Sequence, residues 1–200
     1  MDWVAVALTE DVPAGVVIPS CIEDRDLAIW CAPSGRYHAW SDRCPHRGMR
    51  LSHGFVRGET LACIYHGWQY RENGACDYIP AHPKLTPPST ICVPTYACTE
   101  ADGVVWVSLH QTDSAMPDMG GRQPVRSMPI NLSASDLAAH FGAEDFTTIA
   151  VVSDHDVLFA VQPCTDSACV IHALASPDAD RSSVSRWLED LRATLEGVPA

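Results

Sequence analysis

The chain has 200 residues, of which 46% are apolar and 19% are charged, and its formal net charge at pH 7 is −12. The apolar share allows a sizeable core and argues against extensive disorder, while the acidic excess argues against binding to nucleic acid or to an anionic membrane surface. No apolar run spans a bilayer and acidic residues interrupt the N-terminal segment, so neither a transmembrane helix nor a secretory signal is expected. An acidic surface suits a partner with a basic docking face, or serves solubility alone.

The cysteine content favours reduced thiols. Nine cysteines are present, an odd number in a chain that is long for a disulfide-stapled secreted domain. We therefore expect a cytoplasmic protein. Apart from the two cysteines of the motif described below, the thiols are expected to be separate, small buried side chains: Cys21, Cys31, Cys76, Cys92, Cys98, Cys164 and Cys169.

Residues 1–110 have the pattern of many short strands and no helix. Charged residues 23–25 separate two apolar runs, which predicts a hairpin, and Asn73-Gly74 predicts a second tight turn. Residues 80–88 are rich in proline and are expected to be irregular. The pattern predicts an antiparallel sandwich or barrel. Its expected strands are residues 3–6, 15–21, 26–31, 36–40, 60–64, 68–71, 77–79, 92–97 and 104–109.

Residues 111–200 differ from the first 110 residues in composition and in hydrophobic pattern. Residues 111–127 carry paired glycines and two prolines and are expected to be a linker. Residues 128–200 predict a small α+β unit, with a helix at 135–141 and a longer helix that Ser182 or Ser183 caps. Its strands are expected at 146–152, 157–162 and 169–174. One apolar stripe marks the longer helix: Val184, Trp187, Leu188, Leu191 and Leu195.

Two short motifs supply the residues that carry chemistry. Cys44-x-His46 and Cys63-x-x-His66 each offer one thiolate and one imidazole, with sixteen residues between His46 and Cys63. Glycine follows each histidine closely, so that the backbone can turn sharply. Two sulfur and two nitrogen ligands suit either a zinc ion or an iron–sulfur cluster.

The motifs with their flanks, Cys-Pro-His-Arg-Gly and Cys-x-Tyr-His-Gly-Trp, resemble the Rieske [2Fe–2S] signature of the ring-hydroxylating oxygenase and Rieske-type ferredoxin branch. The resemblance covers residues 3–109 and implies a Rieske-type β sandwich with a cluster-binding subdomain. It implies that Cys44 and Cys63 bind one iron of a [2Fe–2S] cluster. His46 and His66 would bind the other iron and leave their far ring edges at the surface.

The flanks also distinguish between branches of the family. In Rieske proteins of cytochrome bc complexes, an extra cysteine in each loop forms a disulfide and a serine hydroxyl contacts a cluster sulfur. Here those positions are Met49, Tyr65 and Trp68. Fewer hydrogen bonds to the sulfurs stabilise the reduced cluster less, so we expect a reduction potential of about −150 mV.

No mononuclear iron site is recognised in the second half. The catalytic domains of the oxygenases hold this iron with two closely spaced histidines and a carboxylate. After residue 110 no two histidines are close in sequence. Asp154-His155-Asp156 is an isolated ligand-like cluster, and His172 lies within an expected strand. The order of strands and helix weakly resembles the end of an oxygenase catalytic domain, which suggests a remnant or a docking module.

The resemblance implies an electron-transfer component without catalytic residues of its own. It would carry one electron at low potential from a reductase, its donor, to an oxygenase, its acceptor. Two alternatives stay open: a shortened oxygenase subunit that needs a partner chain for the mononuclear iron, and a redox or iron–sulfur sensor. The motif also resembles the Rieske domain attached to reductases of N- and O-demethylase systems.

Overall fold

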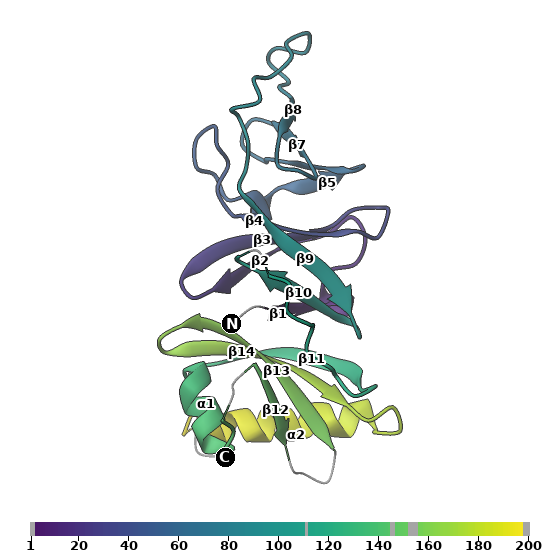
Figure 1. Cartoon of the computed structure of the whole chain (residues 1–200), viewed down its shortest axis with the longest axis vertical. Coiled ribbons are helices and arrows are strands. Elements are labelled where there is room, and N and C mark those ends of the chain that lie inside the picture. The colour runs from purple at the N-terminus through teal and green to yellow at the C-terminus, as the bar shows by residue number, and fades with distance from the viewer. Residues whose placement is uncertain (1–2, 111, 145–146, 152–155, 198–200) are drawn as a thin grey trace.

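Three layers stack along the long axis of the molecule in a computed structural model (Figure 1). The structure describes residues 3–110, 112–144, 147–151 and 156–197. All three sheets are antiparallel. The expected mainly β architecture, with a small α+β unit at the C-terminal end, is confirmed. Within the described residues, no helix is both long and apolar enough to cross a bilayer.

The middle layer is a six-stranded sheet with the strand order β1-β10-β9-β4-β3-β2. The sheet curls so that its two edges approach, and the Ser20 hydroxyl of β2 donates a hydrogen bond to the carbonyl of Val6 in β1. Glu23 and Asp24 both have positive φ, the geometry of the tight turn that the hairpin pattern predicted. The strands are β1 (Val4–Leu8), β2 (Val17–Ile22), β3 (Arg25–Cys31), β4 (Tyr37–Ser41), β9 (Thr95–Ala101) and β10 (Val104–Ser108).

The upper layer is inserted between β4 and β9 and carries both ligand motifs. It is a four-stranded sheet of very short strands: β5 (Phe55–Arg57), β6 (Thr60–Ala62), β7 (Gln69–Arg71) and β8 (Cys76–Tyr78). In the described part of residues 1–110 the only helices are two 3₁₀ turns, η1 (Thr9–Asp11) and η2 (Leu51–His53). The pattern of short strands without an α-helix therefore predicted this half correctly.

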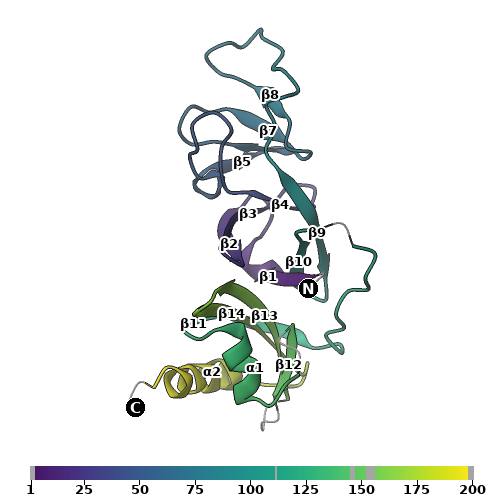
Figure 2. The same cartoon turned by 60° about the vertical axis from the view of Figure 1, so that its left-hand side comes forward.

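The lower layer combines one sheet with two helices on a single face. Its strands, in the order β11-β14-β13-β12, are β11 (Gln123–Ile130), β12 (Thr148–Val151), β13 (Val157–Thr165) and β14 (Ala168–Ala175). The helices are α1 (Ala134–His140) and α2 (Arg181–Leu195), and both lie on the face turned away from the middle layer (Figure 2). Because β11 begins at Gln123, the expected linker is shorter than residues 111–127.

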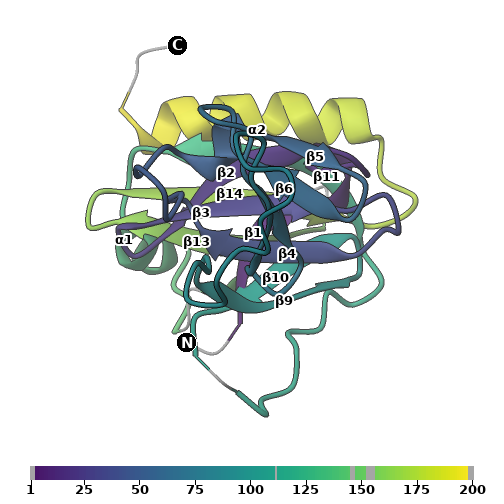
Figure 3. The same cartoon turned by 90° about the horizontal axis from the view of Figure 1, so that it is seen from above.

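Helix α2 forms where its apolar stripe predicted it and spans much of the width of the molecule when seen from above (Figure 3). Val184 and Leu188 are fully buried against the sheet. The cap differs from the prediction. The N-cap residue of α2 is Asp180 rather than Ser182 or Ser183. Its carboxylate accepts a hydrogen bond from the backbone N–H of Ser182 at 3.1 Å.

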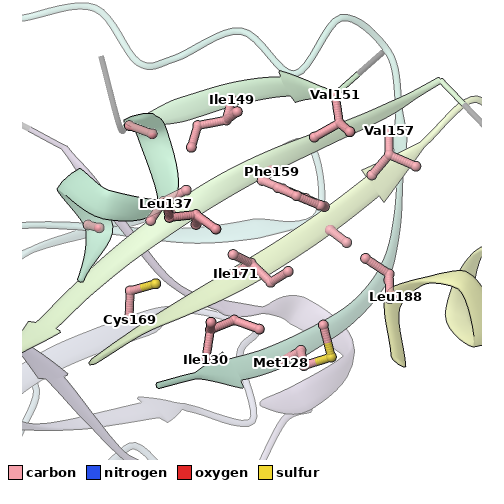
Figure 4. Packing of buried hydrophobic residues seen from close by; sticks show 14 of the residues in the cluster. Met128, Ile130, Leu137, Ile149, Val151, Val157, Phe159, Cys169, Ile171 and Leu188 are labelled. Carbon is pink, nitrogen blue, oxygen red and sulfur yellow. The ribbon is translucent and has the colours of Figure 1, made fainter. Parts of the chain in front are cut away.

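Strand β13 is buried on both faces because it lies between the helices and the middle layer. Phe159 and its alternate neighbours face the helices in the cluster shown in Figure 4. Leu158 and Ala160 point the other way and join a second cluster that includes Leu8 and Trp106 of the middle layer. A strand buried on both faces requires a continuous apolar run, and the sequence of β13 has one.

A disulfide also joins the middle and lower layers, which corrects one prediction. Cys21 of β2 is bonded to Cys164 of β13, across a sequence separation of 143 residues. The expectation of separate thiols is wrong for these two, because pairing depends on the packing of β2 beside β13 rather than on any spacing in the sequence. Cys92 is exposed rather than buried.

Candidate metal centre

The first ligand loop closes on itself through its own backbone. The N–H of Cys44 donates to the carbonyl of Met49 at 2.8 Å, and the N–H of Gly48 donates to the carbonyl of Cys44 at 2.8 Å. Gly48 has a φ of 68°, in the left-handed region that favours glycine. The loop is therefore a tight turn that fixes Cys44 at its start.

The second loop repeats this pattern. The N–H of Cys63 donates to the carbonyl of Trp68 at 2.9 Å, and the N–H of Gly67 donates to the carbonyl of Cys63 at 2.9 Å. Gly67 has a φ of 70°. Two loops with different motifs thus present one cysteine each in the same backbone setting, which makes them a matched pair.

The four candidate ligands separate by depth. Cys44 and Cys63 are buried, with 4% and 2% of their surfaces exposed, and both belong to one core cluster. His46 is half-buried and His66 is exposed, and their ring centroids lie 4.7 Å apart in an edge-on arrangement. The structure therefore brings two thiols together below two imidazoles at the surface.

The electrostatics of the centre follow from this packing. Burial, together with the neighbouring Cys44, raises the pKa of the Cys63 thiol. Burial and the nearby His66 and Arg47 lower the pKa of His46. The raised pKa of Cys63 disfavours its free thiolate, which a bound cation would stabilise, whereas the lowered pKa of His46 favours the neutral imidazole that can bind a metal.

Aromatic rings flank both imidazoles. Trp68 stacks on His46 with centroids 4.2 Å apart and planes 5° from parallel. Tyr65 lies against His66 with centroids 3.9 Å apart. These contacts fix the orientation of both histidine rings, which supports packing as the role of the two aromatic side chains.

Tyr70, on β7, is a site residue that the sequence did not reveal. Its hydroxyl lies 3.1 Å from the sulfur of Cys44, and its side chain is fully buried. Burial and the neighbouring Cys44 raise the pKa of Tyr70, so its hydroxyl keeps its proton and is able to donate to a thiolate at Cys44. The available signal was its place two residues after Trp68, on the inward face of an alternating strand.

A buried carboxylate holds the first loop in place. Asp42 is fully buried and accepts hydrogen bonds from the backbone N–H of Ser52 at 2.7 Å and from its hydroxyl at 2.6 Å. Arg50 adds an ion pair to Asp42 at 3.3 Å. Because these residues lie on either side of the loop, they fix its two ends relative to each other.

The other residues considered in the sequence do not join this centre. His172 is buried in the lower layer and bonded through both ring nitrogens, to Ser127 at 2.8 Å and Gln162 at 3.1 Å. Asp154 and His155 lie outside the described residues. Arg47 is exposed and has no ion pair with any residue that the structure describes.

The donor set fits a two-iron cluster better than a single ion. In the described part of the chain, no group of three or more His, Cys, Asp or Glu side chains is arranged to hold one metal ion. A Rieske cluster requires fewer protein ligands per metal ion than a mononuclear site, because each iron takes only two protein ligands and completes its coordination with sulfide. One pair of buried thiols and one pair of surface imidazoles meet that requirement.

Comparison with known proteins identifies the class. Residues 2–97 match the family described as the Rieske [2Fe–2S] domain. The chain therefore contains a Rieske domain, and its cofactor is a Rieske-type [2Fe–2S] cluster.

Its homologues include members of the Rieske oxygenase family. The chain is 33% identical to oxidoreductase NdmD of Pseudomonas putida over 204 residues, which cover 86% of this chain and 35% of NdmD. It thus spans about a third of that relative. Its fold matches the structure of Pseudomonas putida CBB5 NdmA with a TM-score of 0.78 at 18% identity, covering 98% of this chain and 79% of that one. Dicamba monooxygenase gives the same TM-score at 18% identity, with 98% and 85% covered.

Proposed function

We propose that Cys44, His46, Cys63 and His66 bind the [2Fe–2S] cluster and that the chain is a one-electron carrier between a reductase and an oxygenase. The main support for this proposal is the difference in burial among the four side chains. The two thiols are buried, and the two imidazoles lie above them at the surface with ring centroids 4.7 Å apart. When bound, the cluster supplies reversible one-electron oxidation and reduction of iron.

The protein's own residues would hold this chemistry in a defined environment. The matched backbone turns position both thiols, while Trp68 and Tyr65 orient the imidazoles. Tyr70 donates a hydrogen bond toward the Cys44 sulfur. The exposed edge of His66 gives a short path between the buried centre and a docked partner.

The first experiment tests the ligands. We expect two irons and two sulfides per chain in the reconstituted protein, with the electron paramagnetic resonance spectrum of a Rieske cluster after reduction. Cys63→Ser should lose the iron and the spectrum. Cys92→Ser is the matched control, since its thiol is exposed and distant from the motifs in sequence, and it should keep both. A Cys63→Ser protein with full iron content would contradict the assignment.

The second experiment tests the carrier role. The reduced protein is mixed with an oxidised Rieske oxygenase, and its reoxidation is followed by absorbance in the absence and presence of the oxygenase substrate. Electron transfer to the oxygenase supports a carrier. Product formed from the substrate by this chain and a reductase alone would rule a pure carrier out.

One observation favours a second candidate, a shortened oxygenase subunit. The fold match to NdmA and dicamba monooxygenase extends over 98% of the chain and so includes the lower layer. Under this proposal residues 128–200 are a remnant of a catalytic domain, and a partner chain supplies the mononuclear iron. Product formation only after a second chain is added, with the third iron bound by that second chain, would favour this candidate.

A further inference from the structure

The upper layer differs in charge from the rest of the molecule. Residues 42–78, which contain both ligand loops and β5–β8, carry five arginines and four acidic residues, a formal charge of +1. Since the whole chain carries −12, the other residues carry −13. The acidity that dominates the composition is therefore concentrated away from the metal centre.

The acidic side chains of this layer are all bound to arginine. Asp42 pairs with Arg50, and Asp77 pairs with Arg71. Glu59 and Glu72 both pair with Arg36 of the middle layer, at 3.6 and 2.8 Å. The charges of Asp42 and Asp77 are thus offset by their arginines, whereas Glu59 and Glu72 share one guanidinium and leave a single negative charge.

Two arginines of the layer remain without an acidic partner among the described residues. Arg47 is exposed and follows the candidate ligand His46 directly. Arg57 is exposed at the end of β5, where its guanidinium lies 4.8 Å from the ring centroid of Phe55. These two positive charges exceed the single negative charge left at Glu59 and Glu72, so the upper layer keeps a net positive charge.

The same layer holds four of the five large apolar side chains that are exposed in the described part of the chain. Ile64 and Tyr65 of the second loop are 56% and 53% exposed beside His66. The other large apolar residues that are exposed in the described part of the chain are Phe55, Tyr78 and Leu85. A groove of about 260 Å³, lined in part by Phe55 and Tyr78, runs from Gly67 to Arg57. Apolar contacts rimmed by charge are typical of a protein docking face.

We propose that this face, defined by Arg47, Arg57, Ile64 and Tyr65 around the imidazole edges, docks a one-electron redox protein whose own docking face is acidic. The inference rests on the proposed carrier function and names the partner's chemistry. It reverses the expectation from the net charge, which favoured a basic partner.

Screening decides which charges the partner senses. At about 0.1 M salt the Debye length is about 10 Å, so exposed charges further away contribute little to the encounter. The two unpaired arginines belong to the contact face, whereas only four of the 25 acidic residues of the chain lie within residues 42–78. The local positive charge therefore steers the partner, and opposite charges on the partner raise the association rate.

The test uses two redox proteins of opposite charge as probes: an acidic plant-type ferredoxin and basic cytochrome c. Affinity of the cluster-loaded chain for each is measured by calorimetry at 0.1 M salt, and electron transfer from reduced ferredoxin is followed by stopped flow. Arg47→Glu and Arg57→Glu should each weaken ferredoxin affinity and slow electron transfer by about fivefold. Arg186→Glu on α2, an exposed arginine of the lower layer, is the matched control and should change both by less than about twofold.

The outcomes separate docking from function. Tighter binding of cytochrome c than of ferredoxin, or unchanged ferredoxin affinity in both upper-layer variants, would overturn the docking proposal. Ferredoxin binding that depends on Arg47 and Arg57 without any electron transfer would leave docking intact and refute the carrier function. Circular dichroism and iron content confirm that each variant is folded and loaded.

Discussion

The hydrogen bond from Tyr70 to Cys44 gives a quantitative prediction for Tyr70→Phe. The phenol oxygen and the sulfur are 3.1 Å apart and both residues are buried, so water does not replace the lost donor. A hydrogen bond to a ligand sulfur is stronger when the cluster carries the extra electron, and therefore stabilises the reduced state. If the difference between redox states is about 1 kcal/mol, removal of the hydroxyl lowers the reduction potential by about 40 mV.

The potential is measured by a redox titration of the loaded protein followed by electron paramagnetic resonance. Tyr78→Phe is the matched control, because this tyrosine lies on the neighbouring strand β8 and is 36% exposed. We expect its potential to stay within about 10 mV of the parent value. An unchanged or higher potential in Tyr70→Phe, with full iron content, would show that the hydroxyl does not act on the sulfur.

Three further predictions concern stability. Cys164→Ser removes the disulfide to Cys21 and should lower the free energy of unfolding by about 4 kcal/mol in urea titrations under oxidising conditions, with no effect once the parent is reduced. Burial lowers the pKa of His172 to about 4, so only the unfolded chain takes up a proton at this residue as the pH falls from about 6.5 to 4. The free energy of unfolding should therefore drop by up to about 3 kcal/mol over this range. His172→Gln should remove that part of the pH dependence, and a variant with the same pH profile as the parent would refute the prediction. Gly54→Ala places a Cβ 2.2 Å from the carbonyl oxygen of Ala62, next to the second loop, and should lower the melting temperature and the iron content together.

The sequence was informative where structure depends on neighbours along the chain. The alternating runs of the first 110 residues predicted the short strands, and the apolar stripe from Val184 to Leu195 predicted α2. The motifs pointed to Cys44, His46, Cys63 and His66, which the structure brings together in two matched turns. Local hydrogen bonds and periodic burial decide these features, and both leave a pattern in the residue order.

Contacts between distant segments left no such pattern. In the sequence, Tyr70 is only one of several apolar residues of a predicted strand, and the structure is needed to show that its hydroxyl lies next to the sulfur of Cys44. In the sequence, Asp42 cannot be distinguished from an ordinary loop aspartate, and the structure is needed to show that Ser52 of η2 donates hydrogen bonds to its carboxylate. The sequence also could not predict that Arg47 lacks an ion pair, because an ion pair depends on which carboxylates the fold brings close to the guanidinium.

The junction of the middle and lower layers bears on how the C-terminal unit is to be understood. The amide nitrogen of Gln162 donates to the backbone carbonyl of Cys21 at 2.6 Å, which fixes the orientation of the amide. Its oxygen must then accept from Nε2 of His172, so the neutral imidazole carries its proton on that nitrogen. Nδ1 is left to accept from the Ser127 hydroxyl, which also lies 2.5 Å from the carboxylate of Asp11.

A serine hydroxyl has one proton, so Ser127 cannot donate to His172 and to Asp11 at once. When His172 takes up a proton, Nδ1 donates to Ser127 and the hydroxyl donates to Asp11, which completes the chain of hydrogen bonds. Desolvation opposes this protonation and dominates, since the pKa of His172 falls to about 4. The network thus ties η1 of the first half to β11 and β14 of the second. Together with the disulfide and the shared apolar cluster, it makes the lower layer a part of the Rieske unit's own support rather than a freely tethered module.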